Sequence, residues 1–534
     1  MASKLTSLSP RLRGGLAIVA SAGMTALAAP AVGLSPLALI ALAPLVWAVT
    51  TARTWRAALA VGVLASMATG ALLYHWLPGS LNAFFGFPIA ASWAVFPFYA
   101  AVAQPQLVLW AVARWRLRHH TDARALVASA ALYAGLDWAL PKLFHDTLGV
   151  SFYADRWAIQ VADLGGLYAL TFAAVLVAEV ACAVVIFRRR SVGAAVTAGV
   201  VWAAILGYGA LRSRQIEAQT AAAPSFIAGV AQANIGNIEK EIAKRGDLDA
   251  IVDTLAAYGK LSEQLVVDLP AGVARPDVVI WPETAYPLAY GAHRSPVDDD
   301  MDRELSTWAQ KRQVPLLFGG YRREGGTEFN SAILLDSAGE VQAYHKFHLI
   351  PFGEYIPLLG RAKFGTGGSP RVLNLAVARP QGAGAAPAPS APTAATAAQA
   401  PLTARLGPII CYESLIPSHA AAAVRAGAQA LVNLTNDSWF VSTAEKKLHL
   451  AMAAVRSVET RRAQLRATNT GISVLILPNG QLREPGPVDD AAALRYQVPL
   501  LDSEPTLCVR GGVWTGPACL LLSLLALVLG RRKR

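Results

Sequence analysis

Most hydrophobic positions in the first part of the chain fall into long apolar runs, not into the periodic patterns of a soluble domain. A helix rises about 1.5 Å per residue, so roughly 20 apolar residues are needed to cross about 30 Å of hydrocarbon. Runs of this length predict eight transmembrane helices, the last of them far from the other seven. The predicted helices are residues 14–30, 34–50, 57–74, 90–112, 125–141, 164–187, 192–211 and 513–530.

The chain between the seventh and eighth runs has a different pattern, in which short β-branched runs alternate with amphipathic stretches. This alternation is typical of an α/β fold or of an αββα sandwich. We therefore predict a membrane domain at 1–211, a soluble α/β domain at 212–511, and the eighth helix with a basic tail at 512–534.

Within the α/β domain the pattern predicts individual elements. The predicted strands are residues 226–233, 277–281, 314–319, 331–335, 406–410, 430–434 and 472–477. The predicted helices are residues 249–267, 301–313, 415–428 and 444–466. Residues 379–402 are almost all Ala, Pro, Gly, Ser and Thr, which cannot form a packed face, so we predict a disordered surface insertion there.

Composition and charge exclude some classes of protein. Of the 534 residues, 54% are hydrophobic and 15% are charged, which excludes a disordered basic protein. The net charge of +12 divides into +8 in residues 1–211, zero in 212–511 and +4 in the tail. Because the α/β domain is neutral, no nucleic-acid partner is expected.

The positive charges also predict an orientation. Sixteen Lys and Arg lie on one side of the predicted helices, whereas the opposite loops hold only Lys142 and Arg156. By the positive-inside rule, both termini are then cytoplasmic and the α/β domain lies across the membrane from them. An alternative for the first run is a cleaved signal peptide, but removing it would break the charge alternation.

Four cysteines are too few for a disulfide framework. Cys182 and Cys519 lie inside predicted membrane helices and Cys508 lies just before the last one, which leaves Cys411 deep in the α/β domain. The histidines show no spacing to cysteine that is typical of a metal site, and no cofactor is expected.

Three segments place an ionisable residue directly after a strand-like run, where open α/β sheets carry their functional groups. They are residues 277–283 (DVVIWPE), 344–357 (YHKFHLIPFGEYIP) and 407–413 (GPIICYE). Taken singly, such a glutamate or lysine is more often a solvated loop residue, and such a cysteine more often part of a core. Their occurrence together favours a catalytic site.

The three residue types complement each other chemically. A thiol becomes a nucleophile as its thiolate, a glutamate can accept its proton, and a lysine can stabilise both the thiolate and a developing oxyanion. The helix predicted after Cys411 would add backbone N–H groups and the positive end of its dipole. A general base contributes about 10²–10⁴-fold and one oxyanion donor about 10²–10³-fold, which together suffice for acyl transfer through a thioester.

These motifs, W-P-E, Y-H-K-x-H-L-x-P-F-G-E-Y-x-P and I-C-Y-E, resemble the Glu-Lys-Cys signature of the nitrilase superfamily. With N-L-T-N-D-S-W-F at 433–440, seven predicted helices before the domain and one after it, the chain resembles the apolipoprotein N-acyltransferases, the membrane-embedded branch. The roles that this resemblance implies are catalytic for Glu283, Lys346 and Cys411, and supporting for Glu354, Tyr412 and Glu413.

The resemblance also implies a two-step reaction at the periplasmic face of a bacterial inner membrane. The cysteine would take an acyl chain from a phospholipid, typically phosphatidylethanolamine, and release a lysophospholipid. The amine of the diacylglyceryl-cysteine on an apolipoprotein would then accept the acyl chain from the thioester. Apolar residues near the motifs could form a lipid-facing portal or be ordinary core: Phe352, Leu358, Leu359, Trp439 and Phe440.

Two other functions remain open from the sequence. A membrane-anchored amidase of the nitrilase type would use the same three residues and thioester, with water replacing the lipoprotein amine. A transporter or sensor could use the α/β domain only to bind a ligand, although the intact Glu283, Lys346 and Cys411 argue against it.

Overall fold

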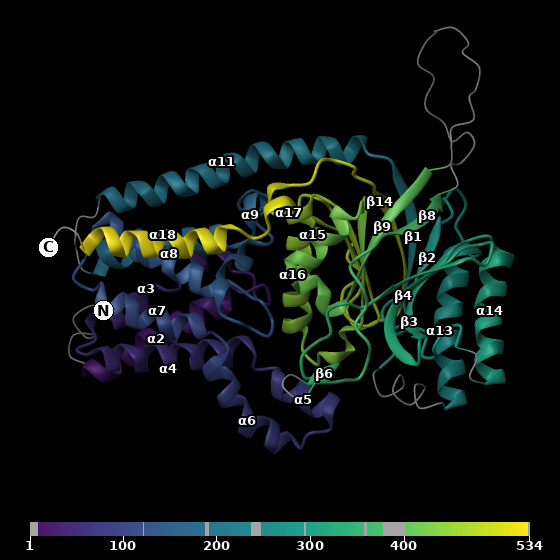
Figure 1. Cartoon of the computed structure of the whole chain (residues 1–534), viewed down its shortest axis with the longest axis horizontal. Helices are drawn as coiled ribbons and strands as arrows, with labels where there is room; N and C mark the ends of the chain where they lie inside the picture. The colour runs from purple at the N-terminus through teal and green to yellow at the C-terminus, as the bar shows by residue number, and fades with distance from the viewer. Residues whose placement is uncertain are drawn as a thin grey trace, which may run out of the picture.

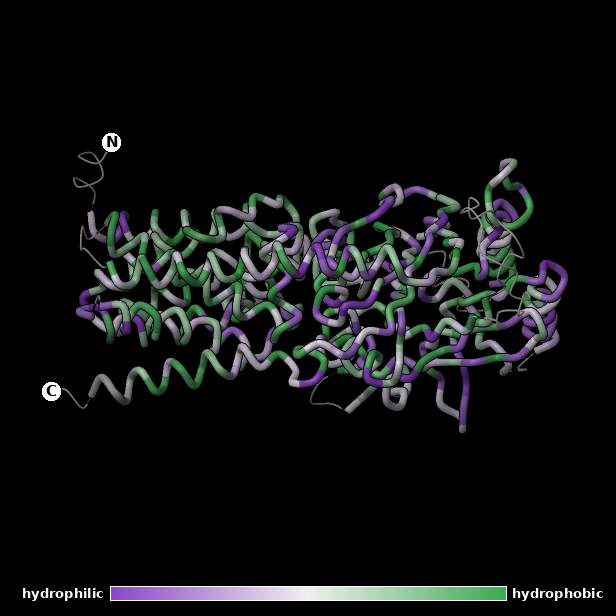
Figure 2. Tube along the Cα trace, turned by 90° about the horizontal axis from the view of Figure 1, so that it is seen from above, coloured by the Kyte–Doolittle hydropathy of each residue, from purple (hydrophilic) through white to green (hydrophobic). Residues whose placement is uncertain are grey.

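The structure, a computed structural model, describes residues 9–120, 122–186, 192–236, 247–292, 295–356, 360–377 and 402–531. They form a helical part and an α/β part that lie side by side (Figure 1). Hydrophobic residues run along the whole helical part, whereas the α/β part mixes hydrophilic and hydrophobic segments (Figure 2).

The helical part is built from both ends of the chain. Its main helices are α2 (Pro10–Ala28), α3 (Ala43–Thr51), α4 (Trp55–Leu73), α5 (Leu77–Phe85), α6 (Ile89–Val102), α7 (Pro105–Arg116), α8 (Ala123–Ala139), α9 (Ala162–Gly165), α10 (Tyr168–Ala181), α11 (Val192–Ala222), α17 (Leu507–Gly511) and α18 (Thr515–Arg531). The C-terminal helix α18 packs along α8, and α11 runs along the bundle to the α/β part, where β1 begins at Ser225 (Figure 1).

The prediction of eight transmembrane helices is supported only in part. Among the described residues, three helices are long and apolar enough to cross a membrane. They are Trp55–Leu73, Tyr168–Val185 and Val192–Ala222. Length and composition therefore support a membrane-embedded helical part, but not eight full-length spans.

Two of the predicted spans are interrupted helices. Ile89–Val102 and Pro105–Arg116 pass the same test together, but the pair is bent by 41°. The run 34–50 is divided into a 3₁₀ helix, Ser35–Leu39, and α3. A proline stands near the start of the second piece in both cases, and its missing N–H prevents one continuous helix.

The α/β part has two six-stranded sheets at its centre. Its strands are β1 (Ser225–Gln232), β2 (Val278–Ile280), β3 (Leu316–Glu324), β4 (Thr327–Leu335), β5 (Val341–His345), β6 (Tyr355–Ile356), β7 (Arg361–Ala362), β8 (Leu373–Val377), β9 (Leu402–Ile410), β10 (Ala430–Thr435), β11 (Ala463–Thr468), β12 (Val474–Ile476), β13 (Leu482–Arg483) and β14 (Ala492–Pro499). One sheet has the order β14-β1-β2-β3-β4-β5 and the other β13-β12-β11-β10-β9-β8. Apolar residues of both sheets, such as Ile280, Leu406 and Leu465, form one core between them.

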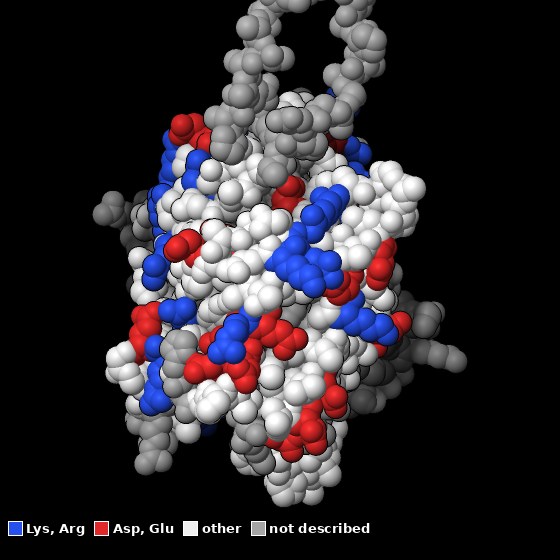
Figure 3. All heavy atoms as spheres, turned by 90° about the vertical axis from the view of Figure 1, so that its right-hand side faces the viewer, with Lys and Arg blue, Asp and Glu red and all other residues white. Residues whose placement is uncertain are grey.

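Helices cover the outer faces of both sheets. They are α13 (Leu248–Val266), α14 (Pro296–Arg312), α15 (Pro417–Arg425) and α16 (Thr443–Thr460). The first two cover one sheet, and the last two lie between the other sheet and the helical part (Figure 1). The predicted αββα sandwich is therefore present. On the end farthest from the helical part, basic and acidic side chains are interspersed (Figure 3).

The predicted helix 444–466 is wrong at its C-terminal end. The helix α16 stops at Thr460, because Arg461 adopts a left-handed φ of 53°, and β11 follows in the second sheet. All residues of β11 are buried, so its sequence lacks the alternation of a half-exposed strand.

Besides the two-residue strands β6, β7 and β13, three longer strands are absent from the predicted set: β5, β8 and β14. All three lie at the edge of a sheet, where part of the strand is exposed and polar residues interrupt the apolar run. The predicted insertion at 379–402 lies outside the described residues, apart from Leu402, with which β9 begins.

A buried arginine joins the two parts of the molecule. Arg461, just after α16, donates to Asp163 Oδ2 at 2.9 Å and to Gln160 Oε1 at 2.6 Å, both in the helical part. Arg461 and Asp163 are almost completely buried. Because a buried charge is costly unless it is paired, this contact fixes how the α/β part sits on the helices.

The variant Arg461→Ala should lower the free energy of unfolding by about 3 kcal/mol, because it leaves the Asp163 carboxylate buried with less compensation. The loss should lie at the low end of the range for breaking a buried ion pair, since Arg212 also contacts Asp163 at 2.8 Å. Chemical unfolding of the purified protein in detergent would measure it. The control Arg303→Ala removes an exposed pair with Asp300 and should cost less than about 1 kcal/mol. Equal losses in the two variants would contradict the assigned role of Arg461.

Candidate active site

The candidate nucleophile lies on a strained turn at the end of a buried strand. β9 ends at Ile410, and Cys411 begins a 3₁₀ helix, Cys411–Leu415, that leads into α15. The backbone of Cys411 has a φ of 49°, in the left-handed region that non-glycine residues rarely adopt. Such strain persists only where the surroundings hold it, and it often marks a functional residue.

Glu413 ties this turn to the segment that follows β5. Its Oε2 accepts the N–H of Ile410 at 2.7 Å, and its Oε1 accepts the Tyr344 hydroxyl at 2.6 Å and the N–H of Phe347 at 2.7 Å. The glutamate is fully buried. One carboxylate therefore fixes the nucleophile turn relative to Lys346, which lies between Tyr344 and Phe347 in the chain.

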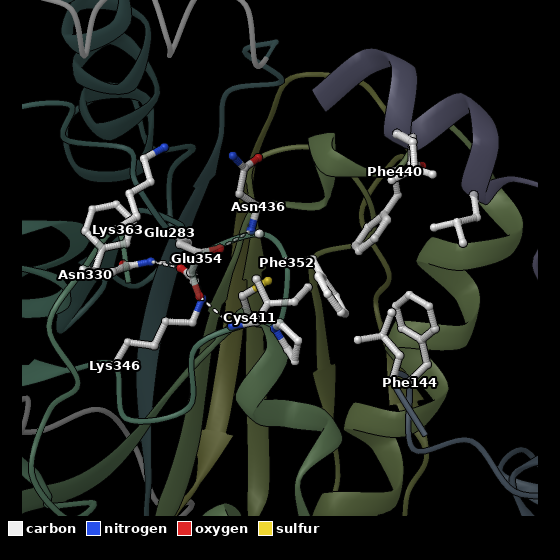
Figure 4. A pocket seen from close by; sticks show the side chains of 18 of the residues that line it. Phe144, Glu283, Asn330, Lys346, Phe352, Glu354, Lys363, Cys411, Asn436 and Phe440 are labelled. Atoms are coloured by element: carbon white, nitrogen blue, oxygen red, sulfur yellow. Dashed lines mark hydrogen bonds and ion pairs between the residues drawn. The ribbon is translucent and has the colours of Figure 1, made fainter. Parts of the chain in front are cut away.

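Lys346 lies between two carboxylates in the interior. Its Nζ is 3.1 Å from Glu283 Oε1 and 2.9 Å from Glu354 Oε1, and the lysine is only 1% exposed (Figure 4). Its backbone N–H donates to the carbonyl of Asn330 at 2.8 Å. The structure thus brings Glu283 together with Lys346 and Glu354, which come from two of the three segments.

Two asparagines that the sequence analysis did not single out complete the polar cluster. The Asn330 side chain donates to Glu283 Oε1 at 2.9 Å and to Glu354 Oε1 at 3.3 Å. The backbone N–H of Asn436 donates to Glu283 Oε2 at 3.0 Å. The signal for Asn330 was an amide inside an apolar strand, because a buried polar side chain needs a partner.

The surroundings of Cys411 and Lys346 set their protonation states. Burial raises the pKa of the Cys411 thiol well above its ordinary value, Glu283 raises it further, and Lys346 partly opposes them. Burial alone would lower the pKa of Lys346, but Glu283 and Glu354 raise it well above its ordinary value. At neutral pH the site therefore holds a thiol and an ammonium, and the thiol needs a base to become a nucleophile.

A cavity of about 550 Å³ connects this cluster with the helical part. Cys411, Glu283 and Lys346 line one end of it. The opposite wall is largely apolar and comes from both parts of the molecule, with Trp76, Leu81, Tyr99, Phe144 and Phe440 among its residues. The polar cluster and the aromatic wall face each other across the cavity in Figure 4. Its size is that of a small-ligand site.

Of the five predicted portal residues, two line the cavity. Phe352 lines the cavity with a left-handed φ of 65° and is 63% exposed. Phe440 also lines it and makes an edge contact with Trp76 at 5.8 Å between ring centroids. Leu358 and Leu359 lie outside the described residues, and for Trp439 the structure describes only the backbone, in the 3₁₀ helix Asp437–Trp439.

Tyr412 points away from the polar cluster. Its hydroxyl donates to the carbonyl of Leu143, at 3.0 Å, in the segment after α8. The residue after the nucleophile thus contacts the helical part directly.

A polar network that the sequence analysis missed lies behind the nucleophile turn. The Ser414 hydroxyl donates to the carbonyl of Cys411 at 2.8 Å and lies 2.8 Å from His449 Nε2. His449 Nδ1 is 2.9 Å from Asp437 Oδ1, and Arg466 contacts the same carboxylate at 2.7 Å. Burial opposes ionisation of Asp437, but Arg466 and His449 lower its pKa to about 2. Asp437 therefore stays ionised, and the hydrogen bonds of Ser414 and His449 hold the turn.

The described residues contain no group of three His, Cys, Asp or Glu side chains that could hold a metal ion. The cavity itself places a thiol beside a carboxylate and an ammonium, an arrangement that suits a cysteine nucleophile.

The sequence matches two families over most of its length. Residues 227–485 match the family described as Carbon-nitrogen hydrolase. Residues 21–180 match the family described as Apolipoprotein N-acyltransferase N-terminal domain.

Individual proteins are similar over the whole chain or over the α/β part. An amidase structure from Nesterenkonia sp. is 22% identical, covers 51% of this chain and 90% of its own, and has a TM-score of 0.34. The apolipoprotein N-acyltransferase of Bdellovibrio bacteriovorus is 29% identical over 86% of this chain and 83% of its own length. That of Gloeobacter violaceus is 31% identical over 97% of this chain and 94% of its own length. Identity at this level over nearly the whole length means that the chain belongs to the apolipoprotein N-acyltransferase family.

Proposed function

We propose that this chain transfers an acyl chain from a phospholipid, through a thioester on Cys411, to the amine of diacylglyceryl-cysteine on an apolipoprotein. The observation that carries the proposal is the cavity in which Cys411, Glu283 and Lys346 face an apolar wall from the helical part. A soluble substrate would need no such wall, whereas an acyl chain does. Membership of the apolipoprotein N-acyltransferase family supports the same activity.

The first step forms the thioester. Glu283 accepts the thiol proton of Cys411 while the sulfur attacks the ester carbonyl of the phospholipid, and the Lys346 ammonium stabilises the oxyanion. The C–O bond to glycerol then breaks, and the proton on Glu283 passes to the departing alkoxide. A lysophospholipid leaves, and the acyl chain remains on Cys411.

The second step transfers the acyl chain to nitrogen. The α-amine of the diacylated apolipoprotein attacks the thioester, a C–N bond forms and the C–S bond breaks. Glu283 carries the amine proton to the departing thiolate, so that the Cys411 thiol is restored. Glu354 and Asn330 act as positioning residues, because Glu354 accepts a hydrogen bond from Lys346 and Asn330 donates one to Glu283.

Phosphatidylethanolamine is the proposed donor, and the bacterial inner membrane the proposed location. The apolar helices and the family support a membrane protein. We further propose that all eight apolar segments lie in the bilayer, with both termini cytoplasmic and the α/β part periplasmic. The supporting observation is the excess of Lys and Arg on the cytoplasmic side of this arrangement.

We also propose that apolar residues at the mouth of the cavity form a portal for lipid. Phe352 and Phe440 line the cavity, and we propose that they guide acyl chains to Cys411 together with Leu358, Leu359 and Trp439. The exposure of Phe352 supports this role, since a large apolar side chain in water is costly unless lipid covers it.

The assigned roles predict the behaviour of single variants with a phospholipid labelled in its acyl chain. Cys411→Ala should form no hydroxylamine-sensitive adduct. Glu283→Gln should form it about 10²–10⁴-fold more slowly, because the thiol then lacks its base. Gel analysis of the labelled protein would measure both, with Cys519→Ala, a change in α18, as the control that keeps full adduct formation.

Addition of a diacylated lipopeptide to the adduct separates transfer from hydrolysis. The label should move to the peptide amine and become resistant to hydroxylamine, because an amide replaces the thioester. An adduct that persists in Cys411→Ala, or label released only as free fatty acid, would contradict the proposal; the second result would favour the amidase.

The raised pKa of Cys411 predicts a pH profile for its alkylation by iodoacetamide. Because only the thiolate reacts, the rate should still rise above the ordinary thiol pKa of 9.0. Glu283→Gln should move the profile to lower pH, since Glu283 contributes to the rise. Mass spectrometry of the Cys411 peptide would follow the reaction, with the denatured chain as the reference. A plateau below about pH 8 would mean that the thiolate is already formed in the resting site.

Phe352→Asp should lower turnover of phospholipid in vesicles but not of a water-soluble short-chain ester, because only the lipid must pass the cavity mouth. The change should not unfold the protein, since this side chain is mostly exposed. The control Val488→Asp changes an exposed apolar residue outside the cavity and should leave both rates unchanged. Equal losses with both substrates, or none, would exclude the portal role.

A further inference from the structure

A second cavity, of about 320 Å³, is separate from the catalytic cavity. Its walls come from the C-terminal ends of α2 and α4, the segment after α8 and the start of α16. It therefore opens where the helical part meets the α/β part. It shares no lining residue with the cavity that contains Cys411.

The lining of this second cavity is divided into a polar inner end and an apolar rim. Gln104, Tyr133 and Asp146 are buried at the inner end. Leu27 and Leu72 lie at the rim and are 43% and 46% exposed on the surface of the helical part. This division matches an amphiphile whose head lies inside and whose chains leave along the helices.

The inner end holds a carboxylate with incomplete pairing. Two buried aspartates, Asp137 and Asp146, share one ammonium, that of Lys142. Lys142 Nζ is 2.6 Å from Asp137 Oδ1 but 3.7 Å from Asp146 Oδ1. Among the described residues, nothing donates a hydrogen bond to that Asp146 oxygen.

A buried carboxylate with incomplete pairing is costly, and a cation bound beside it would offset that cost. Gln104 donates to Asp146 Oδ2 at 2.8 Å and fixes the carboxylate at the cavity. The charge of the inner end therefore favours a small cationic group with hydrogen-bond donors, which a primary ammonium provides.

The rim carries the opposite charge. Lys447, near the start of α16, lines the cavity and is exposed, and its Nζ reaches the carbonyl of Ala31 at 3.4 Å across the cavity mouth. A cation at the rim and an anion inside match a zwitterionic head group whose ammonium is the deeper charge. A phosphodiester would then face Lys447, because lysine is a common phosphate partner.

Tyr74 stands between the two cavities. Its ring packs on Phe144 and Tyr99, which line the catalytic cavity, at 5.5 Å between centroids in both cases. Its hydroxyl accepts from Gln104, at 3.4 Å, on the side of the second cavity. Tyr74 therefore contacts lining residues of both cavities.

We propose that the second cavity binds a phospholipid with a primary ammonium head group, separately from the catalytic cavity. The ammonium lies at Asp146, the phosphodiester at Lys447, and the acyl chains pass Leu27 and Leu72 into the bilayer. This lipid is held and not consumed, because Cys411 does not line this cavity. The inference does not depend on the chemistry proposed for Cys411.

The test uses the full chain as Cys411→Ala, which cannot consume lipid, and native mass spectrometry with added phosphatidylethanolamine or phosphatidylglycerol. Phosphatidylethanolamine should be retained more strongly. Asp146→Asn should weaken its retention about tenfold or more and leave phosphatidylglycerol unchanged, because a hydrogen bond to a charged group is lost. Lys447→Ala should weaken both lipids, since both carry a phosphodiester.

Three further variants assign the lipid to a cavity. Leu72→Trp, at a half-exposed rim position, should displace the lipid without changing any charge. Leu81→Trp narrows the catalytic cavity and should leave the Asp146-dependent lipid bound. Asp300→Asn, an exposed carboxylate on α14, is the matched control and should change nothing.

Equal retention of the two lipids, or unchanged retention in Asp146→Asn, would overturn the proposal. So would loss of the lipid in Leu81→Trp, which would assign it to the catalytic cavity. A thermal midpoint measured for each variant separates loss of binding from loss of fold. If Cys411 proves not to carry an acyl group, the lipid should still bind, so the two proposals fail independently.

Discussion

The active site depends on one buried ammonium, that of Lys346, held between the carboxylates of Glu283 and Glu354. None of these charges could stay in the interior alone, because an unpaired buried charge costs several kcal/mol. Together with Asn330 they form a cluster that keeps the lysine charged and one carboxylate beside a protonated thiol. The groups that we propose as base and oxyanion partner are thus in contact before any substrate arrives.

The second constraint is the junction between the two parts of the molecule. Arg461 and Asp163 pair across it, and Tyr412, the neighbour of the nucleophile, contacts the helical part directly. The helices α15 and α16 form the layer at this junction. Because the junction is fixed, the catalytic cavity has a polar end from the α/β part and an apolar wall to which both parts contribute. An enzyme with two lipid substrates requires this combination.

Much of the α/β part could be predicted, because its central strands are continuous apolar runs bounded by turn residues. The edge strands were missed, since polar residues interrupt their pattern, and β11 was taken for the end of α16 because a fully buried strand shows no alternation. In the helical part, apolar length predicted where helices form but not where prolines interrupt them. Membrane crossing is supported by length and composition for only some of them.

By itself, the sequence indicated the chemistry: a thiol, a carboxylate and an ammonium, each after a strand-like run, in a chain with long apolar helices. These are local properties, fixed by residue type and spacing. Only the tertiary structure decided which other side chains connect these three groups. Asn330, the Glu413 bridge and the network of Ser414 and His449 depend on contacts between residues far apart in the chain. The spacing of these residues along the sequence does not give the distances between their side chains, because the folded structure sets those distances.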